Sequence, residues 1–151
     1  MFVQAVLDLG TDRYGFGFGG TGKKSNNRQF DSYGEPFGKG DVIGCCLNLD
    51  QGEIRFLKNG VDLGLAFKIP QQLMNEVFYP AVVLKNAEIL FNFGDEQFKH
   101  PPPTGYTPIS KADSPKNNPN SLAKSSIPEV KLVANAPQAI IIEVWYFLLC
   151  L

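Results

Sequence analysis

A glycine-rich segment with two lysines comes nearest, in this sequence, to a site of chemistry. Gly17-Phe18-Gly19-Gly20-Thr21-Gly22-Lys23-Lys24 nearly matches the phosphate-binding P-loop pattern G-x-x-x-x-G-K-[ST]. Lys24 stands where the pattern needs the hydroxyl that holds magnesium, and the following residues lack the apolar period of the required helix. We therefore interpret the segment as a glycine-rich strand end followed by a solvated loop, and we disfavour nucleotide binding.

The same region is locally basic in a chain whose net charge is −1. Its candidate binding residues are Arg13, Lys23, Lys24 and Arg28, and Lys39 follows them. Aromatic residues are interleaved with these cations: Tyr14, Phe16, Phe18, Phe30 and Tyr33. One interpretation is a basic surface that binds RNA phosphates or an acidic peptide. The other is a set of solvated loop charges above aromatic residues of the core.

Other reactive residue types show no catalytic or metal-binding spacing. The three cysteines, Cys45, Cys46 and Cys150, are odd in number and lack a C-x-x-C motif, so neither a disulfide framework nor a zinc site is predicted. His100, the only histidine, stands beside three prolines and is expected to be an exposed loop residue. No basic neighbour activates either adjacent thiol. We therefore expect no catalysis and no metal in this chain, and free thiols fit a reducing compartment.

The elements that must position the basic residues are strands. Asp41–Leu49 carries apolar residues at every second position, the period of a strand with one buried face. Glu53–Lys58 and Asp62–Phe67 follow, joined by Asn59-Gly60, which predicts a type I′ hairpin turn. Because this meander cannot bury its apolar face alone, it needs a second sheet.

The residues on either side of the meander also predict strands, which indicates an all-β fold. Strands are expected at Gln4–Leu9, in the aromatic-glycine alternation of Tyr14–Gly20, at Arg28–Tyr33 as a short edge strand, and in a last hairpin of Val77–Leu84 and Ala87–Phe93. A polar loop is expected at Thr21–Asn27, one helical turn within Pro70–Glu76, and an extended closing segment at Phe98–Tyr106.

Composition changes in the last third of the chain. Residues 107–135 are rich in Ser, Pro, Asn and Lys and read as a linker without a packed core. The apolar run from Ala136 to Glu143 suits a strand buried on both faces of a parallel sheet, for which we expect no partner within the chain. Neither a signal peptide nor a stretch of about 18 apolar residues is present, so no membrane partner is expected.

The central meander and the segments Phe78–Val82 and Leu90–Gly94 resemble the SPRY family. The resemblance implies a SPRY-type antiparallel β-sandwich, concanavalin-like in its layers, that serves as a binding module for proteins and sometimes RNA. Its expected division is a partial sandwich at 1–106, incomplete at its N-terminus, a linker at 107–135, and one extra terminal strand within 136–151.

Leu7–Asp12 and Gly15–Ser25 look more specifically like the SPRY insert of a DEAD-box RNA helicase, and Asn135–Glu143 resembles the ATPase strand that resumes after that insert. The resemblance implies a protein- or RNA-interaction module without its own catalysis. ATP and Mg²⁺ would belong to the parent helicase, as would a location in nucleus and cytoplasm. The alternative is a self-standing SPRY adaptor that binds a protein partner through its loops.

The resemblance also implies a truncated chain, because the first SPRY strands would precede Gln4 and Val144–Leu151 replaces an RNA-contacting motif. Phe16, Phe56, Phe91 and Phe93 would then lose contacts with the absent strands. Burying an aromatic side chain contributes roughly 1.5–3 kcal/mol, against roughly 5–15 kcal/mol for a whole domain. We therefore expect a marginally stable or aggregation-prone chain with an exposed apolar tail.

Overall fold

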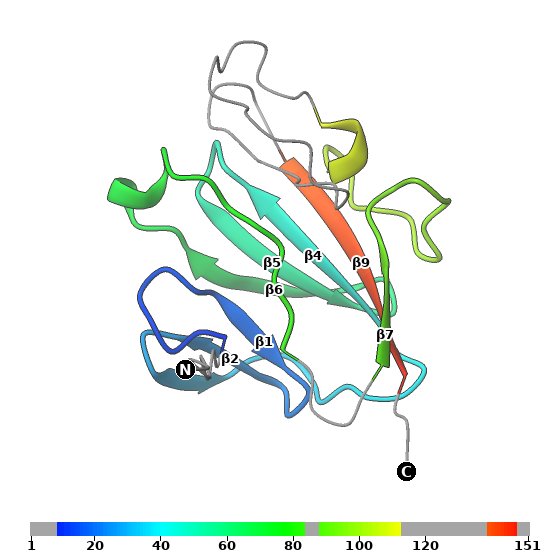
Figure 1. Ribbon diagram of the computed structural model, residues 1–151, viewed down its shortest axis with the longest axis horizontal. Coiled ribbons are helices and arrows are strands. Elements are labelled where there is room, and N and C mark those ends of the chain that lie inside the picture. Colours follow the sequence, from blue (N-terminus) through cyan, green and yellow to red (C-terminus); the bar gives the residue numbers. More distant parts are fainter. Residues whose placement is uncertain (1–8, 84–87, 113–138, 148–151) are drawn as a thin grey trace, which may run out of the picture.

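Two sheets organise residues 9–83, 88–112 and 139–147, the part of the chain that the computed structural model describes (Figure 1). The elements are β1 (Gly17–Gly19), β2 (Lys23–Asn26), β3 (Gln29–Ser32), β4 (Val42–Asn48), β5 (Glu53–Lys58), β6 (Val61–Lys68), the 3₁₀ turn η1 (Gln71–Leu73), β7 (Glu88–Asn92), β8 (Thr107–Pro108), the 3₁₀ turn η2 (Ile109–Lys111) and β9 (Ala139–Phe147). The small sheet has the order β1-β2-β3, and the large sheet has β6-β5-β4-β9-β7, with β8 beside β9. Among these residues, no helix has the length and apolarity needed to cross a membrane.

The central meander is confirmed as the antiparallel strands β4, β5 and β6. Asn59 and Gly60 have φ values of 51° and 83°, as the type I′ turn requires. The Asn59 side chain also fixes the entry to β4: its Oδ1 accepts from the Val42 backbone N–H at 2.9 Å, and its Nδ2 donates to Asp41 Oδ1 at 2.8 Å. The one helical turn expected before residue 76 is η1.

The small sheet corrects one expectation. Residues 23–26 form β2, paired with β1 and β3, although Thr21–Asn27 was predicted to be a loop. The prediction was wrong because Lys-Lys-Ser-Asn has no apolar alternation to indicate a strand. β3 lies at the edge of the sheet, which confirms the short edge strand expected within Arg28–Tyr33.

The core between the sheets is aromatic. The centre of the Phe18 ring in β1 lies 5.0 Å from that of Phe56 and 5.3 Å from that of Tyr33. Tyr33 also ties the layers together through its hydroxyl, which donates to Gly64 O at 2.7 Å and accepts from Phe56 N–H at 3.2 Å. Phe16 packs edge-on against Phe67 of β6 at 5.3 Å. These contacts join two antiparallel layers into the predicted all-β sandwich.

The large sheet is covered on its second face as well. Cys46 is fully buried and Leu57 is 4% exposed, and both pack against Phe98 and Tyr106 of the closing segment. Ile109 in η2 is only 2% exposed, so the packed structure continues past residue 106, where the sequence suggested that the sandwich ends. Residues 113–135 of the predicted linker lie outside the described residues. The domain division itself stays a prediction.

β9 corrects the expectation for the C-terminal apolar run. The strand exists, but it pairs antiparallel with β4 along seven residues and with β7 along five, and only the short β8 runs parallel to it. The expectation that it lacks partners within the chain was therefore wrong. Figure 1 shows β9, in orange to red, between β4 and β7. The part of the predicted exposed tail from Val144 to Phe147 belongs to this strand.

The predicted last hairpin is also corrected. β7 matches its second strand, but residues 77–83 form no strand, and residue 84 of the predicted first strand lies outside the described residues. Phe91 is 43% exposed, whereas Phe56 is 7% exposed. Phe91 is thus poorly covered, as expected, but Phe56 is well packed. The marginal stability inferred from such losses stays a prediction.

Candidate functional site

The loop that carries Arg13 is fastened to the β2–β3 hairpin. Asp12 Oδ1 accepts from the backbone N–H groups of Tyr14 and Gly15 at 2.8 and 2.7 Å, which closes an Asx turn. The Asn26 side-chain amide donates to Gly15 O at 2.8 Å, and the backbone N–H of Asn27 donates to Asp12 O at 2.8 Å. The loop is therefore a defined surface element, held by the end of β2.

The turn that carries Arg28 has an unusual backbone. Asn27 and Arg28 have φ values of 49° and 64°, and Asn26 pairs with Gln29, so these two residues form a two-residue hairpin of the I′ kind. Arg28 donates its backbone N–H to Gly10 O at 3.1 Å. The predictive signal was weak because glycine usually occupies the second position of such a turn. The result is that Arg13 and Arg28 lie on adjoining loops.

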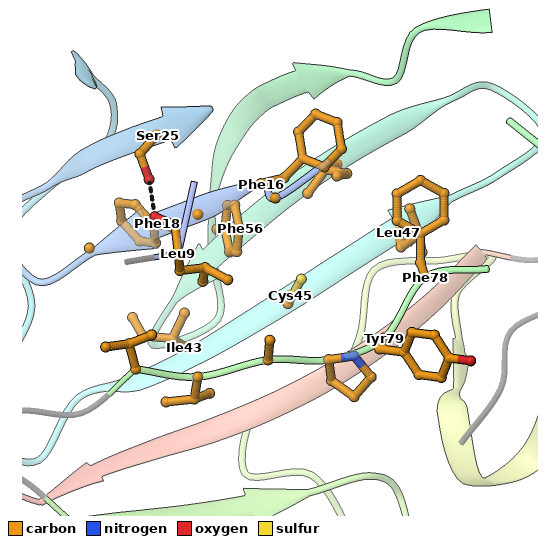
Figure 2. Close-up of a pocket in the computed structure, with 18 of the residues that line it drawn as sticks. Leu9, Phe16, Phe18, Ser25, Ile43, Cys45, Leu47, Phe56, Phe78 and Tyr79 are labelled. Atoms are coloured by element: carbon orange, nitrogen blue, oxygen red, sulfur yellow. Dashed lines mark hydrogen bonds between the residues drawn. The ribbon is translucent and has the colours of Figure 1, made fainter. Parts of the chain in front are cut away.

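The backbone at Leu9 and Gly10 packs closely against Ser25 of β2. Ser25 is 7% exposed, and its hydroxyl donates to Leu9 O at 3.1 Å, as drawn in Figure 2. A Cβ on Gly10, whose φ is 85°, would come within 2.5 Å of the Ser25 backbone oxygen. Only glycine fits here. We call the segment of residues 9–15 the latch, and it covers the outer side of the small sheet at Gly17 and Ser25.

The two neighbouring lysines point to opposite faces of the small sheet. Lys24 shares its register position with Phe18, and its Nζ donates to Ala66 O at 2.7 Å and lies 5.4 Å from the centre of the Phe67 ring. It is a structural bridge between the sheets. Lys23, one residue away, is exposed on the outer face because strand side chains alternate. Of the four predicted binding residues, Lys23 therefore lies on the outer face and Lys24 does not, while Arg13 and Arg28 are exposed on the adjoining loops.

The interleaved aromatics separate in the same way. Phe16, Phe18 and Tyr33 point into the core, as the alternative interpretation expected. Tyr14 and Phe30 are 56% and 59% exposed. Phe30 pairs with Ser25 of the neighbouring strand, so both side chains lie on the outer face of the sheet. The Phe30 ring remains exposed there. The Arg13 guanidinium lies 4.6 Å above the Tyr14 ring. We call this surface, made by Arg13, Tyr14, Lys23, Arg28 and Phe30, the loop face.

The P-loop-like segment has a different geometry from a phosphate-binding loop. β1 and β2 form a hairpin through it, with Gly22 at the turn at a φ of 74°. A strand stands where the P-loop pattern requires the N-terminus of a helix. This geometry fits the strand-end interpretation, although β2 replaces the solvated loop.

A cavity of about 1170 Å³ lies between the sheets (Figure 2). β4 forms its floor with Ile43, Cys45 and Leu47, and Phe78 and Tyr79 line it from the segment that precedes β7. Burial raises the pKa of the Cys45 thiol to about 12, so the thiol stays protonated and unreactive at neutral pH. No group of three His, Cys, Asp or Glu residues within the described ranges could hold a metal. The chemistry of this lining favours apolar contact over catalysis.

His100 differs from its expectation. It is partly buried against the β5–β6 turn, where a Cβ on Gly60 would lie 3.1 Å from its Nδ1. It is thus a packing residue and not an exposed loop residue.

Comparison with known proteins places these features in a family. The model of the SPRY domain matches residues 3–96. ATP-dependent RNA helicase Ddx1 of Drosophila melanogaster is 58% identical over 142 residues, which make up 93% of this chain and 20% of that protein. ATP-dependent RNA helicase DDX1 of Xenopus laevis is 52% identical over 142 residues, with 93% of this chain and 19% of the relative covered. Heterogeneous nuclear ribonucleoprotein U-like protein 2 of Mus musculus is 43% identical over 99 residues, with 62% of this chain and 13% of the relative covered. The chain spans about a fifth of the length of the two helicases.

Proposed function

The chain belongs to the SPRY-domain family, and from this premise we propose that it is the interaction module of an ATP-dependent RNA helicase. The observation that carries the proposal is the 58% identity to a named helicase along 93% of the chain. In this proposal ATP and Mg²⁺ are bound by other parts of the helicase, in the nucleus and cytoplasm. The module itself contributes binding and no catalysis.

The loop face supports the binding part of the proposal. A module that recognises a partner needs exposed side chains held on a rigid support, because every group that must be ordered on binding lowers the affinity. Here the latch fixes the backbone under Arg13 and Arg28, while the side chains of Arg13, Tyr14, Arg28 and Phe30 stay exposed. Arginine and aromatic side chains are the types enriched among the residues that dominate binding energies. The loop face is therefore the surface where we place the partner.

The second candidate is a self-standing SPRY adaptor. The similarity to the mouse ribonucleoprotein U-like protein supports this second candidate, because the name of that relative does not describe a helicase. Both candidates use the loop face, but they differ in the size of the protein in which the sandwich occurs.

An immunoblot distinguishes the two candidates. An antibody raised against the peptide Asp41–Phe67 reports the size of the endogenous protein on a denaturing gel. We expect one band at about five times the 16.6 kDa of this chain, because the chain covers 20% of its helicase relative. A band at the mass of the chain itself would contradict the helicase proposal and favour the adaptor.

A further inference from the structure

The loop face has the chemistry of a surface for single-stranded nucleic acid. Two aromatic rings are more than half exposed, Tyr14 at 56% in the loop before β1 and Phe30 at 59% in β3, whereas Phe16, Phe18 and Tyr33 pack in the core. The face also carries Arg13, Lys23 and Arg28, although the whole chain has a net charge of −1. Exposed rings offer stacking surfaces for bases, and cations beside them neutralise phosphates.

The register of the small sheet sets the spacing of these groups. Phe30 lies opposite Ser25, and Lys23 lies opposite Ser32, so Phe30 and Lys23 are diagonal neighbours on the outer face. Arg28 follows β2 at the hairpin turn, five residues after Lys23. At about 3.3 Å per residue, the three steps from Lys23 to Asn26 span about 10 Å. The cations therefore stand at the two ends of β2, with Phe30 between them.

Two acidic residues, Asp12 and Asp31, belong to the segments that build the loop face. Asp12 is the acidic residue of the latch loop, and its Oδ1 accepts two backbone N–H groups. Asp31 shares its register position with Lys24, on the opposite face from Phe30. The loop face thus combines three cations and two exposed rings, with Asp12 of the neighbouring loop as the carboxylate adjacent to Arg13.

We propose that the loop face binds single-stranded nucleic acid, with bases stacked on Phe30 and Tyr14 and phosphates paired with Arg13, Lys23 and Arg28. An acidic peptide would use the cations, but it would leave the two exposed rings without a matching surface. A duplex is disfavoured because its bases are already stacked on each other. The proposal deepens the proposed interaction function, on which it rests, by naming the chemistry of the ligand.

The test is fluorescence anisotropy of the full 151-residue chain with a labelled single-stranded oligouridine of about ten nucleotides, within the usual range of site sizes. Phe30→Ala is expected to weaken binding at least about five-fold, since one stacked base contributes about 1–3 kcal/mol. Phe30→Tyr keeps the ring and is expected to bind like the unaltered chain. An oligothymidine of equal length shows whether RNA or DNA is preferred, and tight binding of either supports the proposal.

Salt dependence tests the phosphate contacts separately. Arg13→Gln and Arg28→Gly are each expected to reduce the slope of log affinity on log salt by about 0.7, the value for one phosphate of a single strand. Glycine suits the positive φ of Arg28, so this variant keeps the hairpin turn. Lys111→Gln removes the same charge from η2, which Figure 1 shows away from β1 and β2, and is expected to change neither slope nor affinity.

Several results would overturn the inference: no binding of either oligonucleotide, binding unaffected by Phe30→Ala, or equal affinity for a duplex. Binding of a polyglutamate peptide that is lost in the two arginine variants, without oligonucleotide binding, would also overturn it. That last result would leave the loop face as a protein-binding surface and the proposed function intact. Thermal unfolding of each variant serves as the folding control, because the replaced side chains are exposed.

Discussion

Phe56→Ala is expected to lower the free energy of unfolding by about 3–5 kcal/mol, the usual cost of deleting a buried phenylalanine side chain. Phe56 is 7% exposed, and its ring lies 5.0 Å from Phe18 and 6.2 Å from Tyr33. The substitution would leave a cavity between the sheets, where both neighbouring rings lose their partner. Urea denaturation, monitored by far-UV circular dichroism, measures this change in the free energy of unfolding.

Phe30→Ala is the matched control for this prediction. It removes the same atoms from a ring that is 59% exposed, so its effect on unfolding is expected to stay within about 0.5 kcal/mol. Equal losses in the two variants would mean that the core does not lie between the sheets at Phe56. If the chain is as marginally stable as the implied truncation suggested, Phe56→Ala will be unfolded at room temperature.

Val144→Pro is expected to destabilise the large sheet by about 3 kcal/mol or more, since proline removes a backbone donor and does not fit a central strand. Val144 of β9 has a partner on each side, Ile43 in β4 and Phe91 in β7. Among the described residues, β7 joins the large sheet only through β9. Hydrogen exchange is therefore expected to accelerate at the amides of Glu88–Asn92 and along β4.

Val144→Thr controls for the loss of the valine itself. Threonine is β-branched and keeps the backbone N–H, so exchange in β7 is expected to stay slow. Unchanged protection of β7 in Val144→Pro would show that residues 144–147 are an exposed tail, as the sequence alone suggested, and not part of β9.

The parts of the fold that could be predicted are those with local signals. The alternation in Asp41–Leu49 and the Asn59-Gly60 turn placed β4, β5 and β6 to within a few residues. β2 was missed because Lys-Lys-Ser-Asn has no apolar alternation: Lys24 instead reaches Ala66 O, and Ser25 bonds to Leu9 O. The pairing of β9 with β4 joins residues more than 90 positions apart in the sequence, and no local pattern encodes such pairing.

The site was predictable in its region but not in its detail. Arg13, Lys23, Lys24 and Arg28 stay predicted binding residues, and the opposite faces of Lys23 and Lys24 follow only from a strand at residues 23–26. Recognising that strand would have assigned one lysine to each face. The exposure of Phe30 could not be foreseen either, because it depends on which face of β3 the core covers, and one apolar residue in a four-residue strand does not indicate a face.

Photo-crosslinking tests most directly the claim that the loop face is where this protein meets its partners. Benzoylphenylalanine replaces Phe30 in one variant and Val61, which is 65% exposed in β6 of the other sheet, in a control. The chain is irradiated in a cell lysate with and without ribonuclease. We predict adducts from position 30 and none from position 61, with ribonuclease-sensitive adducts indicating RNA. Equal adducts from both positions, or none from position 30, would contradict the account.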